Sequence, residues 1–125
     1  MTDKRQDTPA ALVLGLLAAA LLAQNADAQT QPDLLSANFH LPGCQDLIQQ
    51  KGDAYRRGLC AGILIGLNYF INELPPDRRS CPPDGVKLSQ AARVVLAYIE
   101  RRPQRMHEDF RTLAVEAMHE AWPCK

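Results

Sequence analysis

Residues 53–72 read DAYRRGLCAGILIGLNYFIN, and this stretch decides the fold class. Its apolar residues recur three and four positions apart in two neighbouring stripes, which is the spacing of one side of an α-helix. The stripes are Leu59, Ile63, Gly66 and Phe70, and Cys60, Leu64, Leu67 and Ile71. Asp53 precedes them as a favourable N-cap residue. The sequence therefore predicts a helix over 54–72 that is mostly buried.

Three glycines lie four residues apart in this helix, at Gly58, Gly62 and Gly66. Each glycine costs a helix about 1 kcal/mol relative to alanine. Glycines at this spacing leave a groove in which another helix can approach closely. We expect a helix of the same chain to pack there, and a second copy of the protein is the alternative.

Prolines separate this helix from the segments that follow it. Residues 72–85, NELPPDRRSCPPDG, contain four prolines, which fix φ and remove amide donors. We expect a long, stiff, charged loop here. Beyond it, apolar residues at helical spacing predict a third helix from about Leu88 to Arg102. Pro103 is then expected to open a fourth helix, which stops at Pro123.

Upstream of Asp53, the sequence predicts a short helix over 41–50 whose first turn contains Pro42 and which ends near Gly52. No segment alternates apolar and polar residues for long enough to indicate a strand. The fold class predicted is therefore all-α, a small four-helix domain.

The N-terminus has the pattern of a secretory signal. Lys4 and Arg5 precede an apolar run over 10–23, and the small-residue pattern ADA over 26–28 predicts cleavage after Ala28. The alternative is an uncleaved anchor. We expect a signal peptide over 1–28, a flexible segment over 29–40 and a folded domain over 41–125, exported to the periplasm.

All four cysteines lie in the predicted exported part. An even cysteine count in a small exported domain predicts two disulfides. Cys44 and Cys60 are each eight residues from Gly52, so they lie at matching heights in an antiparallel hairpin that turns there. Cys81 precedes the third helix and Cys124 follows the fourth. We therefore favour the pairs Cys44–Cys60 and Cys81–Cys124 over a zinc site.

The composition gives little sign of catalysis. The 14 basic and 14 acidic residues cancel, which argues against nucleic acid as a partner. The histidines His40, His107 and His119 have no partner at metal-ligand or catalytic spacing. We therefore expect no enzyme activity, no cofactor and no metal.

Several motifs together resemble one known family. They are CAGILIG at 60–66, CPPDGV at 81–86, VVLAYI at 94–99 followed by Arg102-Pro103, and AWPC at 121–124. In this order they resemble the Tai/Rap family of type VI secretion amidase immunity proteins. Lys87 departs from the pattern, because the family often has a threonine there that caps the next helix.

The resemblance implies a periplasmic protein that binds a cognate peptidoglycan amidase effector and blocks its active-site cleft, with no membrane contact after signal cleavage. Some family members act as dimers, so a homodimer is also implied. A proline-rich loop loses little entropy on binding, and its charges offer strong hydrogen bonds. We therefore expect Glu73, Asp77, Arg78 and Arg79 to contact the amidase.

Three alternatives stay open. The protein could inhibit other cell-wall hydrolases. The loop could simply connect two helices. The protein could also be an orphan periplasmic structural or chaperone-like stress protein of the same fold, triggered by protonation of carboxylates in the last helix. Trp122 is expected to fill the core beside Cys124 rather than to anchor a partner.

Overall fold

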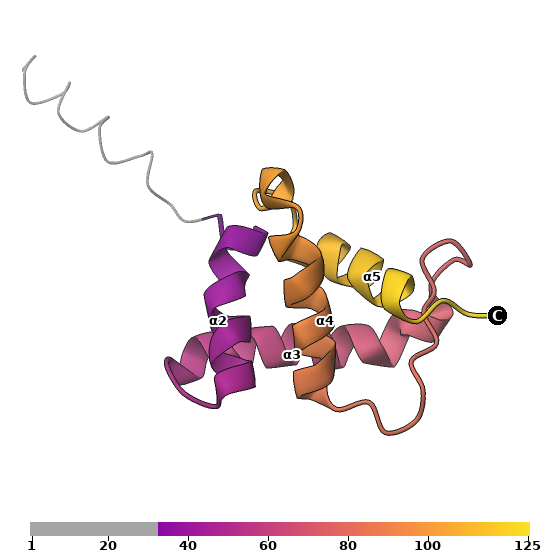
Figure 1. Cartoon of the computed structure of the whole chain (residues 1–125), viewed down its shortest axis with the longest axis horizontal. Coiled ribbons are helices and arrows are strands. Elements are labelled where there is room, and N and C mark those ends of the chain that lie inside the picture. Colours follow the sequence, from indigo (N-terminus) through magenta and orange to yellow (C-terminus); the bar gives the residue numbers. More distant parts are fainter. Residues whose placement is uncertain (1–32) are drawn as a thin grey trace, which may run out of the picture. The chain divides into compact units, whose positions relative to one another are not determined.

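The structure is a computed structural model, and it describes residues 33–125. The predicted signal peptide over 1–28, with its cleavage site, lies outside the described residues. The described part is α-helical, as predicted, and contains two isolated β-bridges but no strand. Its helices, shown in Figure 1, are α2 (Ala37–Gln49), α3 (Ala54–Phe70), the 3-10 turn η2 (Ile71–Glu73), α4 (Leu88–Glu100), the 3-10 turn η3 (Pro103–Arg105) and α5 (Phe110–Ala121).

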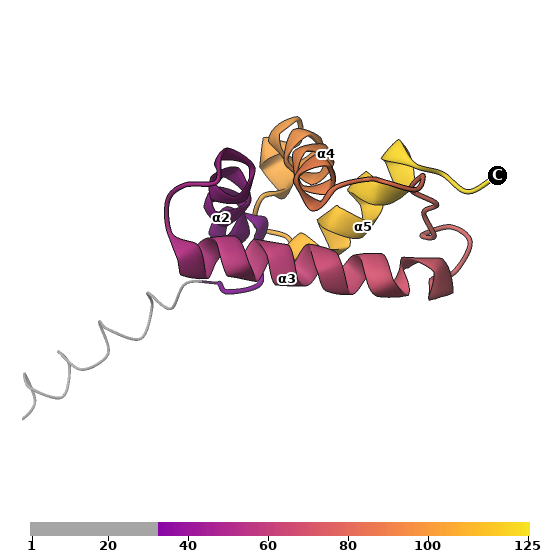
Figure 2. The same cartoon turned by 90° about the horizontal axis from the view of Figure 1, so that it is seen from below.

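Within residues 33–125, helix α3 is the longest element, and the other three α-helices described there all lie on one side of it (Figure 2). The core forms between α3 and this layer. Its fully buried side chains come from all four helices and include Leu64, Val95, Ile99, Phe110 and Leu113. Trp122 packs against this core as a partly buried side chain, as expected.

The hairpin of α2 and α3 follows the sequence prediction closely. Gly52 turns the chain at a φ of +81°, a conformation that favours glycine. The Asp53 side chain accepts a bond from the Arg56 amide at 3.0 Å and caps α3. The predicted Cys44–Cys60 disulfide closes the hairpin, with 5.3 Å between the two Cα atoms.

Helix α2 begins at Ala37, four residues before the predicted start, so Pro42 lies inside the helix rather than in its first turn. The Ser36 side chain accepts a bond from the Phe39 amide and caps it. The first amides are satisfied from a distant segment. The amide of Ala37 donates to the Glu108 carbonyl at 3.0 Å, and that of Asn38 donates to the Met106 carbonyl at 2.9 Å. Residues 37–40 are therefore helical and not part of a flexible segment.

The predicted helix start at Pro103 is wrong. Pro103 opens only the short turn η3, and α5 starts seven residues later at Phe110. The carbonyl oxygens of residues 106 and 108 accept hydrogen bonds from the first amides of α2. They therefore do not serve as acceptors within a helix that runs on from Pro103. Asp109 then caps α5 by accepting a bond from the Arg111 amide at 2.8 Å. Helix α4 starts at Leu88 as predicted, although Lys87 makes no side-chain cap bond.

The prediction that α3 is mostly buried is also wrong. Only Cys60 and Leu64 are buried within this helix. A Cβ added at Gly58, Gly62 or Gly66 would meet no atom of residues 33–125 within 4 Å, so none of the described helices packs on the glycine stripe. The apolar residues of α3 occur all around the helix, but the described part of the chain covers only one side of it.

Candidate partner-binding site

The loop that follows α3 is held in place along its length. The amides of Arg78 and Arg79 both donate to the carbonyl of Pro75, at 2.8 and 2.9 Å. His119 Nδ1 lies 2.6 Å from the Arg79 carbonyl, and the Cys81 amide donates to the Trp122 carbonyl at 2.8 Å. These bonds tie the loop to α5 and to the C-terminal segment.

The predicted disulfide between Cys81 and Cys124 adds a covalent link at the same place, with 5.0 Å between the Cα atoms. The loop is therefore a constrained segment before any partner arrives. A constrained loop loses less conformational entropy on binding than a flexible one.

A groove of about 640 Å³ lies between this loop and α5. Its apolar lining comes from Leu67, Leu74 and Val115. Its charged lining comes from the loop and α5, and comprises Asp77, Arg78, Arg111, Glu116 and Glu120; the imidazole of His119 lies among them. An apolar floor with both signs of charge around it can take an apolar side chain flanked by charged groups.

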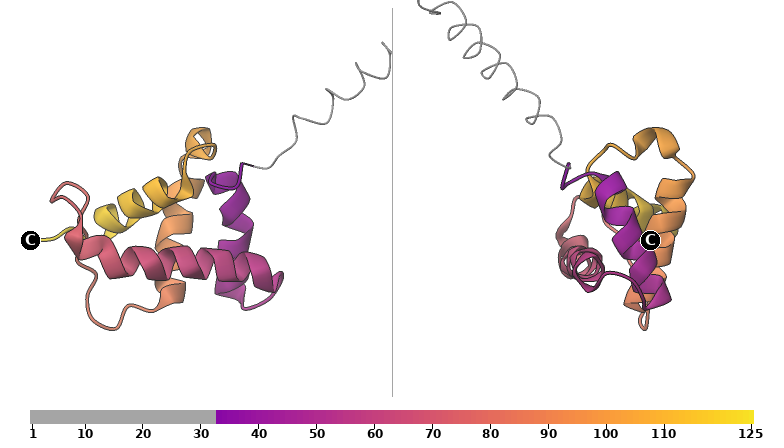
Figure 3. Two further views of the ribbon diagram at one scale, coloured as in Figure 1. Left: turned by 180° about the vertical axis from the view of Figure 1, so that it is seen from behind. Right: turned by 90° about the vertical axis from the view of Figure 1, so that its left-hand side faces the viewer.

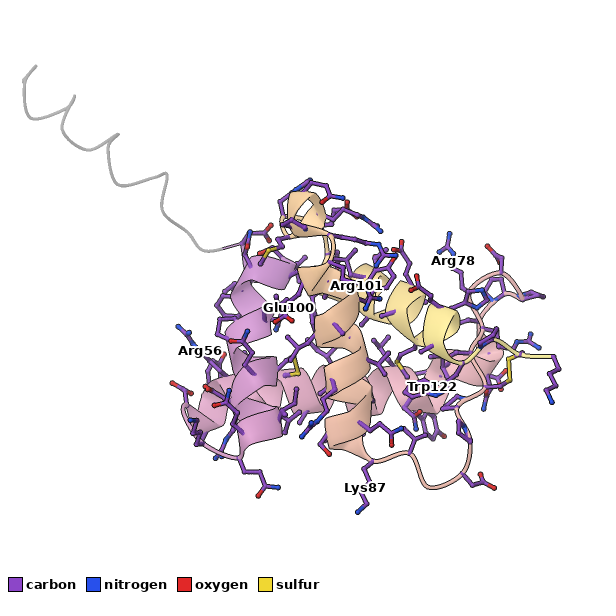
Figure 4. All side chains as sticks on the ribbon, viewed as in Figure 1. Arg56, Arg78, Lys87, Glu100, Arg101 and Trp122 are labelled. Atoms are coloured by element: carbon purple, nitrogen blue, oxygen red, sulfur yellow. A yellow bond between two sulfur atoms is a disulfide. The ribbon has the colours of Figure 1, made fainter. Side chains whose placement is uncertain are left out.

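The structure brings two of the four predicted contact residues to this groove. Asp77 and Arg78 line it and lie 3.8 Å apart at Oδ2 and Nε, with more than two thirds of each side chain exposed. Figure 4 shows Arg78 projecting from the loop beside α5. Glu73 is exposed at the end of η2, and Arg79 donates from Nε to the Leu74 carbonyl at 3.1 Å. Arg79 thus shapes the loop, and neither it nor Glu73 lines the groove.

The α5 residues of the groove were not identified by sequence reasoning. Arg111, Glu116 and Glu120 read as the polar side of an amphipathic helix, whose carboxylates enter only the acid-stress alternative. His119 reads as a histidine without a catalytic or metal-binding partner. These residues lie beside the loop because of contacts between segments that are distant in sequence. The one sequence signal that could have linked them to the site is their shared position on one side of the helix.

A cluster of hydrogen-bonded charges fixes α5 beside α4 and orients Glu116. The Arg105 guanidinium binds Glu108 at 2.7 and 2.8 Å, and Glu116 at 2.6 and 3.1 Å. The Tyr98 hydroxyl donates to Glu116 at 2.7 Å. The hydrogen bonds from Arg105 lower the pKa of both carboxyl groups, and burial together with Glu116 raises the pKa of Tyr98.

Acidification below about pH 4.5 is expected to destabilise the fold through this cluster. In the folded protein Glu108 and Glu116 have pKa values below their ordinary 4.5, so the unfolded chain takes up protons first as the pH falls. The stabilisation is complete above that value and is lost as the pH drops through the folded-state pKa values. Thermal unfolding followed by circular dichroism between about pH 6 and about pH 3 measures the loss.

Glu116→Gln is the matched variant, since it keeps the side-chain shape and removes the charge. As the pH falls from about 4.5 to about 3, we expect the unfolding temperature of this variant to drop by on the order of 3 °C less than that of the unaltered protein. The difference is small because the cluster is partly exposed to solvent. Burial lowers the pKa of His40 from its ordinary 6.5. The unfolded chain therefore binds a proton at this histidine first, and His40 contributes a separate loss of stability that begins as the pH falls below 6.5. Parallel curves for the two proteins below pH 4.5 would contradict the prediction.

Two further observations concern residues 33–125 alone. No cluster of three or more His, Cys, Asp or Glu side chains is placed to hold a metal ion. None of the helices has both the length and the apolar character that crossing a membrane requires.

The comparisons with known proteins place the chain in a family. The profile of the Rap1a immunity proteins matches residues 30–124. No curated protein and no solved structure matched the chain. The matched range includes both disulfides, the loop and the groove, and it confirms the resemblance carried by the sequence motifs. Because the profile covers most of the chain, the protein belongs to the Rap1a family of immunity proteins.

Proposed function

We propose that this protein is exported to the periplasm, where it binds and inhibits a peptidoglycan amidase delivered by type VI secretion. Family membership supports an immunity protein directed against a secreted effector. Two disulfides, without a free cysteine in the described part, fit an oxidising compartment. The role proposed is that of a stoichiometric inhibitor rather than an enzyme.

The constrained loop with its adjoining groove is the feature that carries this proposal. Asp77 and Arg78 are exposed at one wall, and the apolar floor includes Leu74. Such a surface offers charge-assisted hydrogen bonds next to a pocket for an apolar anchor. We propose that the loop and the groove contact the amidase and obstruct its active-site cleft.

The direct test uses the purified, oxidised protein and a panel of type VI peptidoglycan amidases. Binding is measured by pull-down and calorimetry, and inhibition by release of soluble fragments from peptidoglycan. One amidase that is bound and inhibited would support the proposal. If none is bound, and the protein instead binds an apolar dye and suppresses aggregation near about pH 3, the chaperone-like alternative is favoured.

Reversing the charges of Arg78 and Arg79 together is expected to weaken binding to the cognate amidase at least about tenfold, which corresponds to about 1.4 kcal/mol. The single change Arg78→Glu is expected to account for most of this loss, because Arg78 lines the groove while Arg79 bonds to the Leu74 carbonyl. Titration calorimetry of each variant measures the dissociation constants.

Arg56→Glu is the matched control, since Arg56 is an exposed arginine at the opposite end of the domain from Arg78 (Figure 4). It makes the same change in net charge and should leave the affinity unchanged. Equal losses for Arg56→Glu and Arg78→Glu would indicate a general charge effect. An unchanged affinity in the double variant would exclude the loop as the contact.

A further inference from the structure

His119 on α5 presents an uncharged hydrogen-bond acceptor at the groove. Its Nδ1 lies 2.6 Å from the carbonyl oxygen of Arg79, in the loop that Figure 3 shows beside the end of α5. A carbonyl oxygen can only accept, so Nδ1 carries the proton, and in the neutral imidazole the lone pair is on Nε2. Within residues 33–125, Nε2 forms no hydrogen bond, and only Ser80 Oγ is both buried and without a partner. Solvent therefore reaches Nε2.

The charged side chains that line the groove already have partners of opposite charge in the domain. The pairs are Asp77 with Arg78, Arg111 with Asp109, Glu116 with Arg105, and Glu120 with Arg101 and Arg102. A lysine entering the groove would meet Arg78 and Arg111, and a carboxylate would meet Glu116 and Glu120. The lining therefore favours an uncharged side chain over either ion.

The uncharged polar groups of the lining differ in what a partner must do for them. The Tyr98 hydroxyl already donates to Glu116, and Thr112 is exposed. His119 is half-buried, so a partner that fills the groove takes Nε2 out of water. An acceptor that is buried without a donor weakens a complex by about tenfold or more. The partner must therefore donate a hydrogen bond to Nε2.

The floor of the groove requires that this donor stand at the end of an apolar body. Leu67, Leu74 and Val115 line the groove and are each half-buried, so part of each side chain is accessible. Serine and threonine are too short to cover such a floor while their hydroxyl reaches Nε2. Tyrosine combines an apolar ring with a hydroxyl donor at its tip. The exposed guanidinium of Arg78 can also lie against the face of an aromatic ring.

We propose that the groove holds a tyrosine side chain of the effector, with its ring on Leu67, Leu74 and Val115 and its hydroxyl donating to His119 Nε2. The origin of the tyrosine rests on the proposed function, whereas the chemistry of the groove does not. Tyrosine is one of the residues that carry most of the binding energy in protein interfaces.

Titration of the purified, oxidised protein with small probes, followed by NMR of the backbone amides, tests the chemistry of the groove. The probe for tyrosine is p-cresol, and its isomer anisole has the same atoms but no hydroxyl donor. We expect p-cresol to shift amides of the loop and α5 with a dissociation constant on the order of 1 mM. Anisole should bind at least about threefold more weakly.

Equal affinities for p-cresol and anisole would overturn the proposal, and so would the absence of any shift in the groove at about 10 mM p-cresol. Indole and n-butylammonium are probes for tryptophan and lysine. If either binds in the groove more tightly than p-cresol, the occupant is not a tyrosine.

His119→Asn is the variant that removes Nε2 alone. The asparagine amide nitrogen takes the place of Nδ1 and can still donate to the Arg79 carbonyl, and the two residues have similar helix propensities. We expect this variant to bind p-cresol at least about threefold more weakly and anisole as before. His107→Asn is the matched control, since His107 is exposed and does not line the groove. It should leave both affinities unchanged.

A second variant covers the case in which His119→Asn disturbs the loop, which the amide spectrum without a probe reveals. Val115→Ala removes part of the floor and keeps Nε2, so it should weaken p-cresol and anisole by a similar factor. If Val115→Ala changes neither affinity, the probes do not bind in the groove and the proposal is overturned.

These measurements need no amidase, so their failure would leave the proposed function standing. If the panel yields no amidase, the probe titrations still decide what the groove binds. With a cognate amidase, His119→Asn is expected to weaken binding at least about tenfold, and p-cresol should compete more strongly than anisole. Unchanged affinity in His119→Asn would show that the effector places no tyrosine there, even though it is bound and inhibited.

Discussion

Replacing Cys44 and Cys60 with alanine is expected to lower the free energy of unfolding by about 3 to 5 kcal/mol. The bond joins residues 16 apart in sequence, and a cross-link over a loop of this length stabilises a protein by about 3 kcal/mol. Both residues are fully buried in the core between α2 and α3, so the change also removes packed sulfur atoms. Small domains have a total stability of about 5 to 15 kcal/mol, so this loss is a large fraction of it.

Urea unfolding at 25 °C, followed by circular dichroism, measures this loss. The control separates the cross-link from the lost volume. In a protein that carries Cys81→Ala and Cys124→Ala, a reductant breaks only the Cys44–Cys60 bond and retains both side chains. The difference between this reduced protein and a variant in which all four cysteines are alanine gives the packing contribution, because neither protein then contains a disulfide. A decrease of less than about 1 kcal/mol in the alanine variant would mean that α2 and α3 hold together without the bond.

The parts of the fold that the sequence predicted well depend on local signals. Asp53 and Gly52 mark a cap and a turn, and each acts on residues within a few positions of itself. The equal spacing of Cys44 and Cys60 from that turn was enough to predict their pairing. Where the residues that determine an element lie next to it in sequence, composition and spacing predict it.

The boundaries that were predicted wrongly depend on one distant contact. The starts of α2 and α5 are fixed by bonds between residues 37–38 and residues 106 and 108. These bonds satisfy the first amides of one helix and remove the carbonyls that would extend the other. No local pattern near Pro42 or Pro103 reports a partner that is about 70 residues away in sequence.

The candidate site shows the same division. Asp77 and Arg78 could be predicted because a charged, proline-rich loop is a local feature. Glu116 and His119 could not be assigned to the same groove, because their place beside the loop depends on the bond between His119 and the Arg79 carbonyl. The exposure of α3 could not be predicted either. A helix with apolar residues on every side reads as buried in its own chain, although a second molecule can cover one side equally well.

Replacing Cys81 and Cys124 with alanine is expected to weaken the proposed binding to an amidase at least about tenfold and to lower the free energy of unfolding by about 4 kcal/mol. The bond closes 43 residues of sequence and fixes the end of the loop to the segment that follows α5. Without it, the loop keeps its hydrogen bonds to His119 and Trp122 but gains freedom that binding must remove. Calorimetry at a temperature where the variant stays folded measures the affinity.

The two disulfides differ in exposure, and this difference provides the control. Cys44 and Cys60 are inaccessible to solvent, whereas Cys81 is exposed. A dilute dithiol reductant should therefore cleave Cys81–Cys124 first, since thiol–disulfide exchange needs access to a sulfur atom. Alkylation and peptide mapping identify the cleaved bond, and the partly reduced protein should lose affinity to the same extent as the alanine variant. Cleavage of Cys44–Cys60 first would contradict the order predicted from exposure. If affinity survives cleavage of Cys81–Cys124, the loop does not depend on this bond for its binding geometry.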